Sequence, residues 1–193
     1  MASPSTILVY GDSLSAAYGI RPEQGWVALL AQRLTAQGYG YQVINASVSG
    51  ETSGGGRERL PRALQLHQPG IIILELGAND ALRGLPVEGI RDNLAGMVQL
   101  SQAARARVLL VGMRMPPNYG PRYTEGFARI FAEVANQYHL PLVPFLLEKV
   151  ALEPALMQAD GLHPDAAGEP AVLDTLWPHL KPMLGKKSKN GGR

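Results

Sequence analysis

Short apolar runs separated by polar and turn-forming residues are the strongest pattern in the chain. Five of them stand out, at residues 6–10, 41–45, 71–76, 108–111 and 142–145, and each is bordered by glycine, proline, asparagine or serine. Within these runs apolar residues follow one another with few interruptions, most clearly at 71–74. Such runs are typical of strands that are covered on both faces, so they predict a parallel sheet.

The segments between these runs carry apolar residues at helical spacing, which predicts amphipathic helices. The apolar positions are Val27, Leu30 and Leu34; Ile90, Leu94 and Met97; Phe127, Phe131, Val134 and Tyr138; and Val172, Leu176 and Leu180. Thr52 is a candidate cap for a further helix that runs to about His67, and Pro164 is a candidate first residue of the last helix. Strands that alternate with helices predict a three-layer α/β/α fold with about five parallel strands.

The composition assigns this pattern to one globular domain, which we expect to span residues 1–185. Hydrophobic residues make up 46% and charged residues 18% of the 193, a balance that supports a sizeable core. The segment 186–193 is expected to be a basic, flexible tail. It holds four of the 18 Lys and Arg residues, so the rest of the chain has 14 of them against 16 Asp and Glu and a net charge of −2. We therefore expect no binding to nucleic acid.

Some features are absent from the sequence, and their absence restricts the chemistry. The chain has no cysteine, which excludes disulfides, thiolate metal sites and cysteine nucleophiles. No run of 18 apolar residues occurs, so no transmembrane helix is expected. The apolar run at 6–10 is too short for the core of a signal peptide, so the chain is expected to be a mature or cytoplasmic form.

The loops that follow the strands hold the candidate chemical groups, because parallel α/β sheets bind ligands beyond the carboxyl ends of their strands. Ser13 follows the first strand through a sharp Gly-Asp turn. It could cap a turn, bind a flavin phosphate together with Ser15, or act as a nucleophile. Asp160 and His163 are three residues apart in the last loop, a spacing that lets the carboxylate orient the imidazole as a base for a serine.

Two further loop residues carry hydrogen-bond donors that could stabilise a negatively charged oxygen. Gly50 follows the second strand and offers an unobstructed backbone N–H, and Asn79 follows the third strand and offers a side-chain amide. Taken alone, each of them also fits an ordinary turn. Their meaning depends on whether they converge with Ser13.

Taken together, the loop motifs resemble those of the SGNH, or GDSL, hydrolases. The motifs are Gly11-Asp12-Ser13-Leu14, Gly50, Gly77-x-Asn79-Asp80 and Asp160-x-x-His163-Pro164. Longer stretches at 45–53, 74–80 and 115–120 are similar to a bacterial group of multifunctional thioesterases, lysophospholipases and arylesterases. The resemblance spans residues 6 to about 184 and implies the SGNH-hydrolase version of the α/β/α fold.

This resemblance implies a role for each matched residue. Ser13 is the expected nucleophile, His163 the base and Asp160 its orienting partner, while Ser13, Gly50 and Asn79 are the expected oxyanion donors. An acyl groove is expected to be lined by Leu76, Met115, Pro116 and Tyr119. The implied reaction needs no metal or cofactor and hydrolyses aryl esters, short to medium acyl esters, acyl-CoA thioesters and lysophospholipids through an acyl-enzyme on Ser13.

The resemblance also implies the setting in which the protein works. Relatives are commonly exported, so a periplasmic or secreted protein is expected, with a cytoplasmic one as the other option. We expect a small-molecule acyl substrate, no stable insertion into membranes, and a monomer or weak oligomer. Two alternatives stay open at this point: a carbohydrate O-acetyl esterase of the same superfamily, and a flavodoxin-like module that binds a phosphate or flavin without catalysis.

Overall fold

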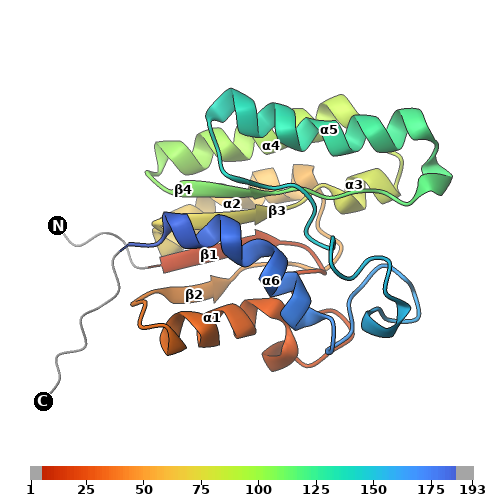
Figure 1. The fold of residues 1–193 in the computed structure, drawn as a ribbon. Coiled ribbons are helices and arrows are strands. Elements are labelled where there is room, and N and C mark those ends of the chain that lie inside the picture. Colours follow the sequence, from red (N-terminus) through yellow and green to blue (C-terminus); the bar gives the residue numbers. More distant parts are fainter. Residues whose placement is uncertain (1–5, 186–193) are drawn as a thin grey trace, which may run out of the picture.

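A parallel sheet of five strands forms the centre of the fold in a computed structural model that describes residues 6–185 (Figure 1). The strand order is β2-β1-β3-β4-β5, and every neighbouring pair is parallel, as in flavodoxin-like sheets. The strands are β1 (Thr6–Gly11), β2 (Gln42–Asn45), β3 (Ile71–Glu75), β4 (Arg107–Val111) and β5 (Leu142–Val143). The predicted α/β fold class and all five predicted strands are confirmed.

Helices cover both faces of the sheet and give the three layers. On one face α1 (Trp26–Ala36) packs against α6 (Glu169–Leu180), and on the other α4 (Val87–Ala103) lies between α2 (Ser53–His67) and α5 (Pro121–Tyr138). The shorter helical segments are α3 (Ala78–Leu82), η1 (Pro22–Gln24), η2 (Pro117–Tyr119), η3 (Pro154–Leu156) and η4 (Lys181–Met183). The sequence pattern did not predict α3, which is too short to show a helical period.

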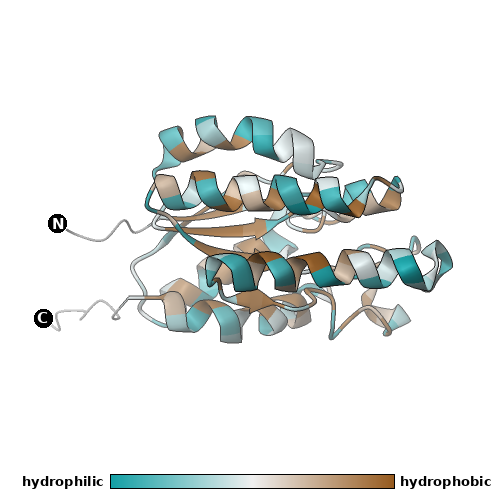
Figure 2. Ribbon diagram, turned by 90° about the horizontal axis from the view of Figure 1, so that it is seen from above, coloured by the Kyte–Doolittle hydropathy of each residue, from teal (hydrophilic) through white to brown (hydrophobic). Residues whose placement is uncertain are grey.

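The sheet owes its burial to the continuous apolar strands. Residues Ile71 to Leu74 of β3 have no exposed surface, and Figure 2 shows the strands mostly brown while the covering helices carry both colours. Within residues 6–185, none of the helices combines the length and the apolar character needed to cross a bilayer. The predicted tail at 186–193 lies outside the described residues.

The predicted helix ends are confirmed in one case and wrong in the other. Thr52 caps α2, since its hydroxyl accepts a hydrogen bond from the Gly55 N–H at 3.2 Å. Pro164, in contrast, does not start the last helix, because it forms an isolated antiparallel bridge with Met157. The chain stays extended there and α6 begins only at Glu169, with Pro170 in its first turn. The preference of proline for the first turn of a helix therefore holds for Pro170 and not for Pro164.

Candidate active site

Loops from distant parts of the sequence meet at the carboxyl edge of the sheet. Ser13 follows β1, Asn79 lies at the start of α3 just after β3, and His163 comes from the loop before α6. All three line one groove of about 560 Å³. The topology thus brings together residues separated by up to 150 positions in the sequence.

A chain of hydrogen bonds connects the serine, the histidine and the aspartate. Ser13 Oγ lies 2.8 Å from His163 Nε2, and His163 Nδ1 lies 2.7 Å from Asp160 Oδ2. A neutral imidazole that donates through Nδ1–H to the carboxylate leaves Nε2 free to accept the serine proton. The ring of Tyr18 lies against the imidazole, with centroids 4.6 Å apart. This arrangement is the geometry that a serine nucleophile and its base require.

Asp160 is held in its ionised form by its own loop. Partial desolvation tends to raise the pKa of this carboxyl, but hydrogen bonds from the Leu162 N–H and from His163 outweigh it, so that the pKa lies below its ordinary value. An ionised Asp160 can fix the imidazole and stabilise its protonated form.

Two links hold the first loop and the last segment of the chain together. The Gln158 side-chain amide donates to the carbonyl oxygens of Tyr18 and Pro164, both at 2.8 Å. Trp26 donates through its indole N–H to the Leu14 carbonyl at 3.1 Å, and through its backbone N–H to Glu169 Oε2 at 2.7 Å. These contacts fix the spacing between Ser13 and His163 from outside the site.

The three expected oxyanion donors differ in how they are engaged. Among the described residues, the backbone N–H groups of Ser13 and Gly50 have no hydrogen-bond partner. Gly50 has a φ of +79°, which a residue with a side chain rarely adopts. Asn79 donates through Nδ2 to Asp12 Oδ2 and to the Glu51 carbonyl, each at 3.0 Å. An oxyanion would therefore share one of the Asn79 N–H groups with these acceptors.

A buried aspartate that was quoted in the sequence motif, but given no role, supports Asn79. Asp80 is 3% exposed and accepts hydrogen bonds from Ser53, from the N–H at 2.7 Å and from the hydroxyl at 2.6 Å. The contact ties α3 to the first turn of α2. The position next to Asn79 in the motif was the available signal for this residue.

Two buried carboxyl groups, those of Glu75 and Asp12, lie next to the site. Glu75 at the end of β3 has no exposed surface, and Asp12 is 1% exposed. Burial raises the pKa of Asp12 to about 6, against the opposing effect of the Leu14 N–H. Burial and the neighbouring Asp12 carboxyl raise the pKa of Glu75 well above its ordinary value. The sequence signal for Glu75 was an acidic residue that ends an otherwise apolar strand.

The groove beside Ser13 is lined mainly by apolar side chains. Two of the four predicted substrate-binding residues, Met115 and Pro116, lie in it. Leu76 does not line the groove, because it is fully buried and packs against Gly56 of α2. The other apolar residues of the lining are Leu14, Ala78, Leu82, Met113, Pro117, Phe145, Leu147, Ala151, Leu152, Met157 and Leu162.

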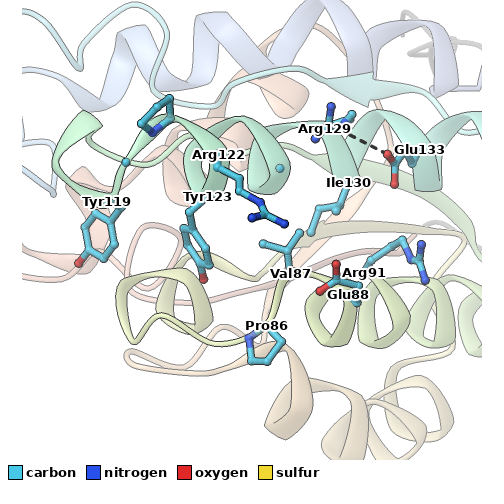
Figure 3. Close-up of a pocket in the computed structure, with 13 residues that line it drawn as sticks. Pro86, Val87, Glu88, Arg91, Tyr119, Arg122, Tyr123, Arg129, Ile130 and Glu133 are labelled. Carbon is cyan, nitrogen blue, oxygen red and sulfur yellow. Dashed lines mark ion pairs between the residues drawn. The ribbon is translucent and has the colours of Figure 1, made fainter.

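The fourth predicted substrate-binding residue, Tyr119, lines a separate groove of about 700 Å³ between α4 and α5. Its hydroxyl donates to the Leu82 carbonyl at 3.1 Å. Figure 3 shows side chains of the two helices facing each other across this groove, with Val87 and Ile130 among charged residues. The placement of Leu76 and Tyr119 therefore corrects the predicted lining.

Comparisons with known proteins agree with this geometry. Residues 9–170 match the model of the GDSL-like Lipase/Acylhydrolase family. The chain is 51% identical to "Esterase TesA" of Pseudomonas aeruginosa over 183 residues, which cover 95% of this chain and 91% of that protein. It is 40% identical to "Thioesterase 1/protease 1/lysophospholipase L1" of Escherichia coli, over 97% of this chain and 88% of that protein.

A solved structure supports the same assignment. The psychrotrophic esterase EstA from Pseudoalteromonas, inhibited by monoethylphosphonate, superimposes with a TM-score of 0.89 and 42% identity, covering 93% of this chain and 98% of that one. The sequence similarity, the shared fold and the hydrogen-bonded Ser13 and His163 lead to one conclusion. The chain belongs to the GDSL-like lipase/acylhydrolase family.

Proposed function

We propose that Ser13 is the nucleophile of an ester hydrolase, with His163 as its base and Asp160 as the residue that orients His163. The chain of short hydrogen bonds from Ser13 through His163 to Asp160, at the mouth of an apolar groove, is the observation that carries the proposal. A serine hydrolase is also the activity expected from membership of the acylhydrolase family. This membership removes the basis for a flavin-binding module.

In the first half of the reaction, Ser13 Oγ forms a bond to the carbonyl carbon of the ester while its proton moves to His163 Nε2. The carbonyl oxygen becomes an oxyanion, for which we propose the N–H groups of Ser13, Gly50 and Asn79 as donors. When the carbon–oxygen or carbon–sulfur bond breaks, the leaving group takes the proton from His163. Ser13 is then acylated.

In the second half, a water molecule attacks the acyl carbon and gives a proton to His163. The bond from Ser13 Oγ to the acyl group breaks, and His163 returns the proton to the serine. The products are a carboxylic acid and the free enzyme. Protons and electrons balance without a metal or a redox partner.

The apolar groove favours an acyl chain over a sugar as the group next to the scissile bond. Met115, Pro116 and Phe145 offer carbon surface, which suits a short to medium acyl ester or thioester better than the acetylated carbohydrate of an O-acetyl esterase. Each methylene that becomes fully buried contributes up to about 0.8 kcal/mol. Binding therefore improves with chain length until the groove is filled.

A substrate panel tests this proposal. It crosses p-nitrophenyl esters of acetate, butyrate, octanoate and palmitate with thioesters of the same acids. We expect kcat/KM to rise severalfold over the first carbons and then to level off, for both leaving groups. A rate that is highest for acetate and falls with every added carbon would favour the O-acetyl esterase.

We also propose that the protein acts as a monomer or weak oligomer outside the cytoplasm, on a small-molecule substrate. The proposed compartment is the one that the resemblance to the bacterial thioesterase, lysophospholipase and arylesterase group implies. Fractionation of cells that express the native gene would show the activity in the periplasm or medium, and light scattering would give the mass of one chain. Activity confined to the cytoplasm would contradict the proposed compartment.

A further inference from the structure

The Glu75 side chain is buried beside the active site with one oxygen that lacks a hydrogen-bond donor. Its Oε2 accepts from the Ser15 hydroxyl at 2.7 Å and from the Asp12 N–H at 3.2 Å. Oε1 is buried and has no partner among the described residues. A charged carboxylate oxygen in that situation would be strongly destabilising. A proton on Glu75 removes the buried charge and turns this oxygen into a hydrogen-bond donor, which then needs an acceptor.

The candidate acceptor is the Asp12 side chain. The Asp12 N–H donates to Glu75 Oε2 at 3.2 Å, which places the two buried residues next to each other, and each carboxyl influences the pKa of the other. Two ionised carboxylates have no proton to share, whereas one protonated and one ionised carboxyl form a strong hydrogen bond. The titratable groups that act on Asp12 from the neighbouring elements are Asp80 of α3 and His163 of the last loop.

The sheet makes room for this pair at one glycine. Gly11 of β1 is the register partner of Glu75 on β3. A Cβ atom at Gly11 would lie 2.5 Å from Glu75 Oε2 and 2.7 Å from the Ser15 hydroxyl. Glycine at this position therefore lets the Glu75 carboxyl turn back under the Ser13 loop.

Asp12 connects the pair to the proposed oxyanion site. Its Oδ1 accepts from the Leu14 N–H at 3.0 Å, and its Oδ2 accepts from the Asn79 amide at 3.0 Å. The position of the Asn79 amide thus depends on the Asp12 carboxylate. The position of the Asp12 carboxylate depends in turn on whether Glu75 donates a hydrogen bond to it.

We propose that Glu75 is a positioning residue that stays protonated at neutral pH and donates a hydrogen bond to Asp12, which in turn orients the Asn79 amide. The same proton limits the charge of the Asp12–Glu75 pair, which lies near the proposed oxyanion site, to −1 instead of −2. The kinetic part of this inference rests on the proposed role of Asn79. The protonation part stands on the buried carboxyl pair alone.

The pH dependence of folding tests the protonation. A carboxyl whose pKa is raised by folding holds a proton in the folded chain that the unfolded chain releases, so its contribution to stability is lost as the pH rises. The variant Glu75→Gln has the same shape, keeps an N–H donor toward Asp12 and cannot titrate. We expect the folding equilibrium constant of Glu75→Gln, divided by that of the wild type, to rise up to about tenfold for each pH unit between about pH 6 and 8.

A ratio that stays flat over this range would mean that Glu75 is already ionised in the folded protein, and it would overturn the proposal. Glu169→Gln is the matched control. Burial also raises the pKa of Glu169, in this case to about 7, but the Glu169 carboxyl accepts from the Trp26 N–H instead of lying beside Asp12. Its ratio should rise with pH and level off above about pH 7, which verifies that the measurement detects a buried carboxyl.

Kinetics test the positioning. Glu75→Gln should keep kcat within about threefold of the wild type, whereas Glu75→Met, which has no donor, should lose about tenfold in kcat with an unchanged KM. If Glu75→Gln and Glu75→Met had equal kcat while only their melting temperatures differed, Glu75 would be a core residue and the positioning role would be wrong.

The design separates this inference from the proposed function. If Glu75→Met does not fold, Glu75→Gln still decides through an infrared difference spectrum, wild type minus variant, recorded at about pH 8, where Glu169 is mostly ionised. The difference spectrum should show the band of one protonated carboxyl, and a spectrum without that band would contradict the proposal. If Asn79→Ala retained full kcat while the folding ratio rose as expected, the oxyanion assignment would fail and the protonated Glu75 would remain.

Discussion

Two grooves among the described residues differ in volume and in lining, and the one with the larger volume contains none of the predicted catalytic residues. The groove between α4 and α5 has a volume of about 700 Å³ and is lined by Arg91, Arg122, Arg129, Glu88 and Glu133 among others (Figure 3). The groove at the carboxyl edge of the sheet has a volume of about 560 Å³ and contains Ser13, Asn79 and His163. The side chains that line a groove, and not its volume, therefore identify the candidate active site.

The difference follows from how each groove is built. Two neighbouring helices line the larger groove, and their exposed faces carry long charged side chains that solvate the surface or pair locally, as Arg129 does with Glu133 at 3.7 Å. The smaller groove is built from loops that follow different strands. Because parallel strands all end at the same edge, such loops bring reactive groups together from distant parts of the chain.

The largest effect is expected for Ser13→Ala, which removes the proposed nucleophile from the smaller groove. We expect kcat for p-nitrophenyl butyrate to fall by about 10⁴-fold or more, with a melting temperature within a few degrees of the wild type, because a loop hydroxyl contributes little to the core. Steady-state kinetics and circular dichroism measure the two quantities. Activity in the Ser13→Ala protein would mean that Ser13 is not the nucleophile, and the larger groove would become the alternative site.

Asn79→Ala should have the second largest effect. Its amide is proposed to bind charge that develops only in the transition state, so kcat should fall by about 10² to 10³ while KM changes little. The comparison of kcat and KM on one substrate measures this. A rise in KM at constant kcat would make Asn79 a contact to the bound substrate instead of an oxyanion donor.

A smaller effect is expected at Met115, in the apolar lining of the smaller groove. Met115→Ser should lower kcat/KM for octanoate severalfold more than for acetate, because the longer chain reaches more of the apolar surface. Competition between the two p-nitrophenyl esters gives the ratio directly. If both rates and the melting temperature fell together, Met115 would be a packing residue.

The smallest effect is expected in the larger groove. Arg122→Ala removes one of its cations and should leave kcat/KM for the butyrate ester within about twofold of the wild type, since surface charges contribute little to stability or to a distant site. Met115→Ser is its matched counterpart in the smaller groove. A loss in Arg122→Ala as large as that in Met115→Ser would end the distinction between the two grooves.

The sequence predicts the sheet and the loop chemistry because both depend on local patterns. A continuous apolar run such as residues 71–74 predicts a strand that is covered on both faces. The order of strands and helices then leaves few possible topologies. The loop residues Ser13, Asn79 and His163 could be named because their motifs are short and lie just after strands or before the last helix.

The remaining errors concern properties that depend on the tertiary structure. Leu76 follows directly on β3, but the direction of its side chain, toward α2 or toward the groove, is set by the twist of the strand and the packing at Gly56. Tyr119 is drawn to the Leu82 carbonyl, a contact across 37 positions. The pairing of Glu75 with Asp12 likewise appears only when β1 and β3 are aligned.

Covalent labelling tests the central claim most directly. The folded protein would be treated with a fluorophosphonate at neutral pH, digested, and mapped by mass spectrometry, in parallel with Ser13→Ala and His163→Ala. The account predicts a single phosphonylated residue, Ser13, with no label in Ser13→Ala and much slower labelling in His163→Ala. Label on any other serine, or equal labelling of the wild type and Ser13→Ala, would contradict it.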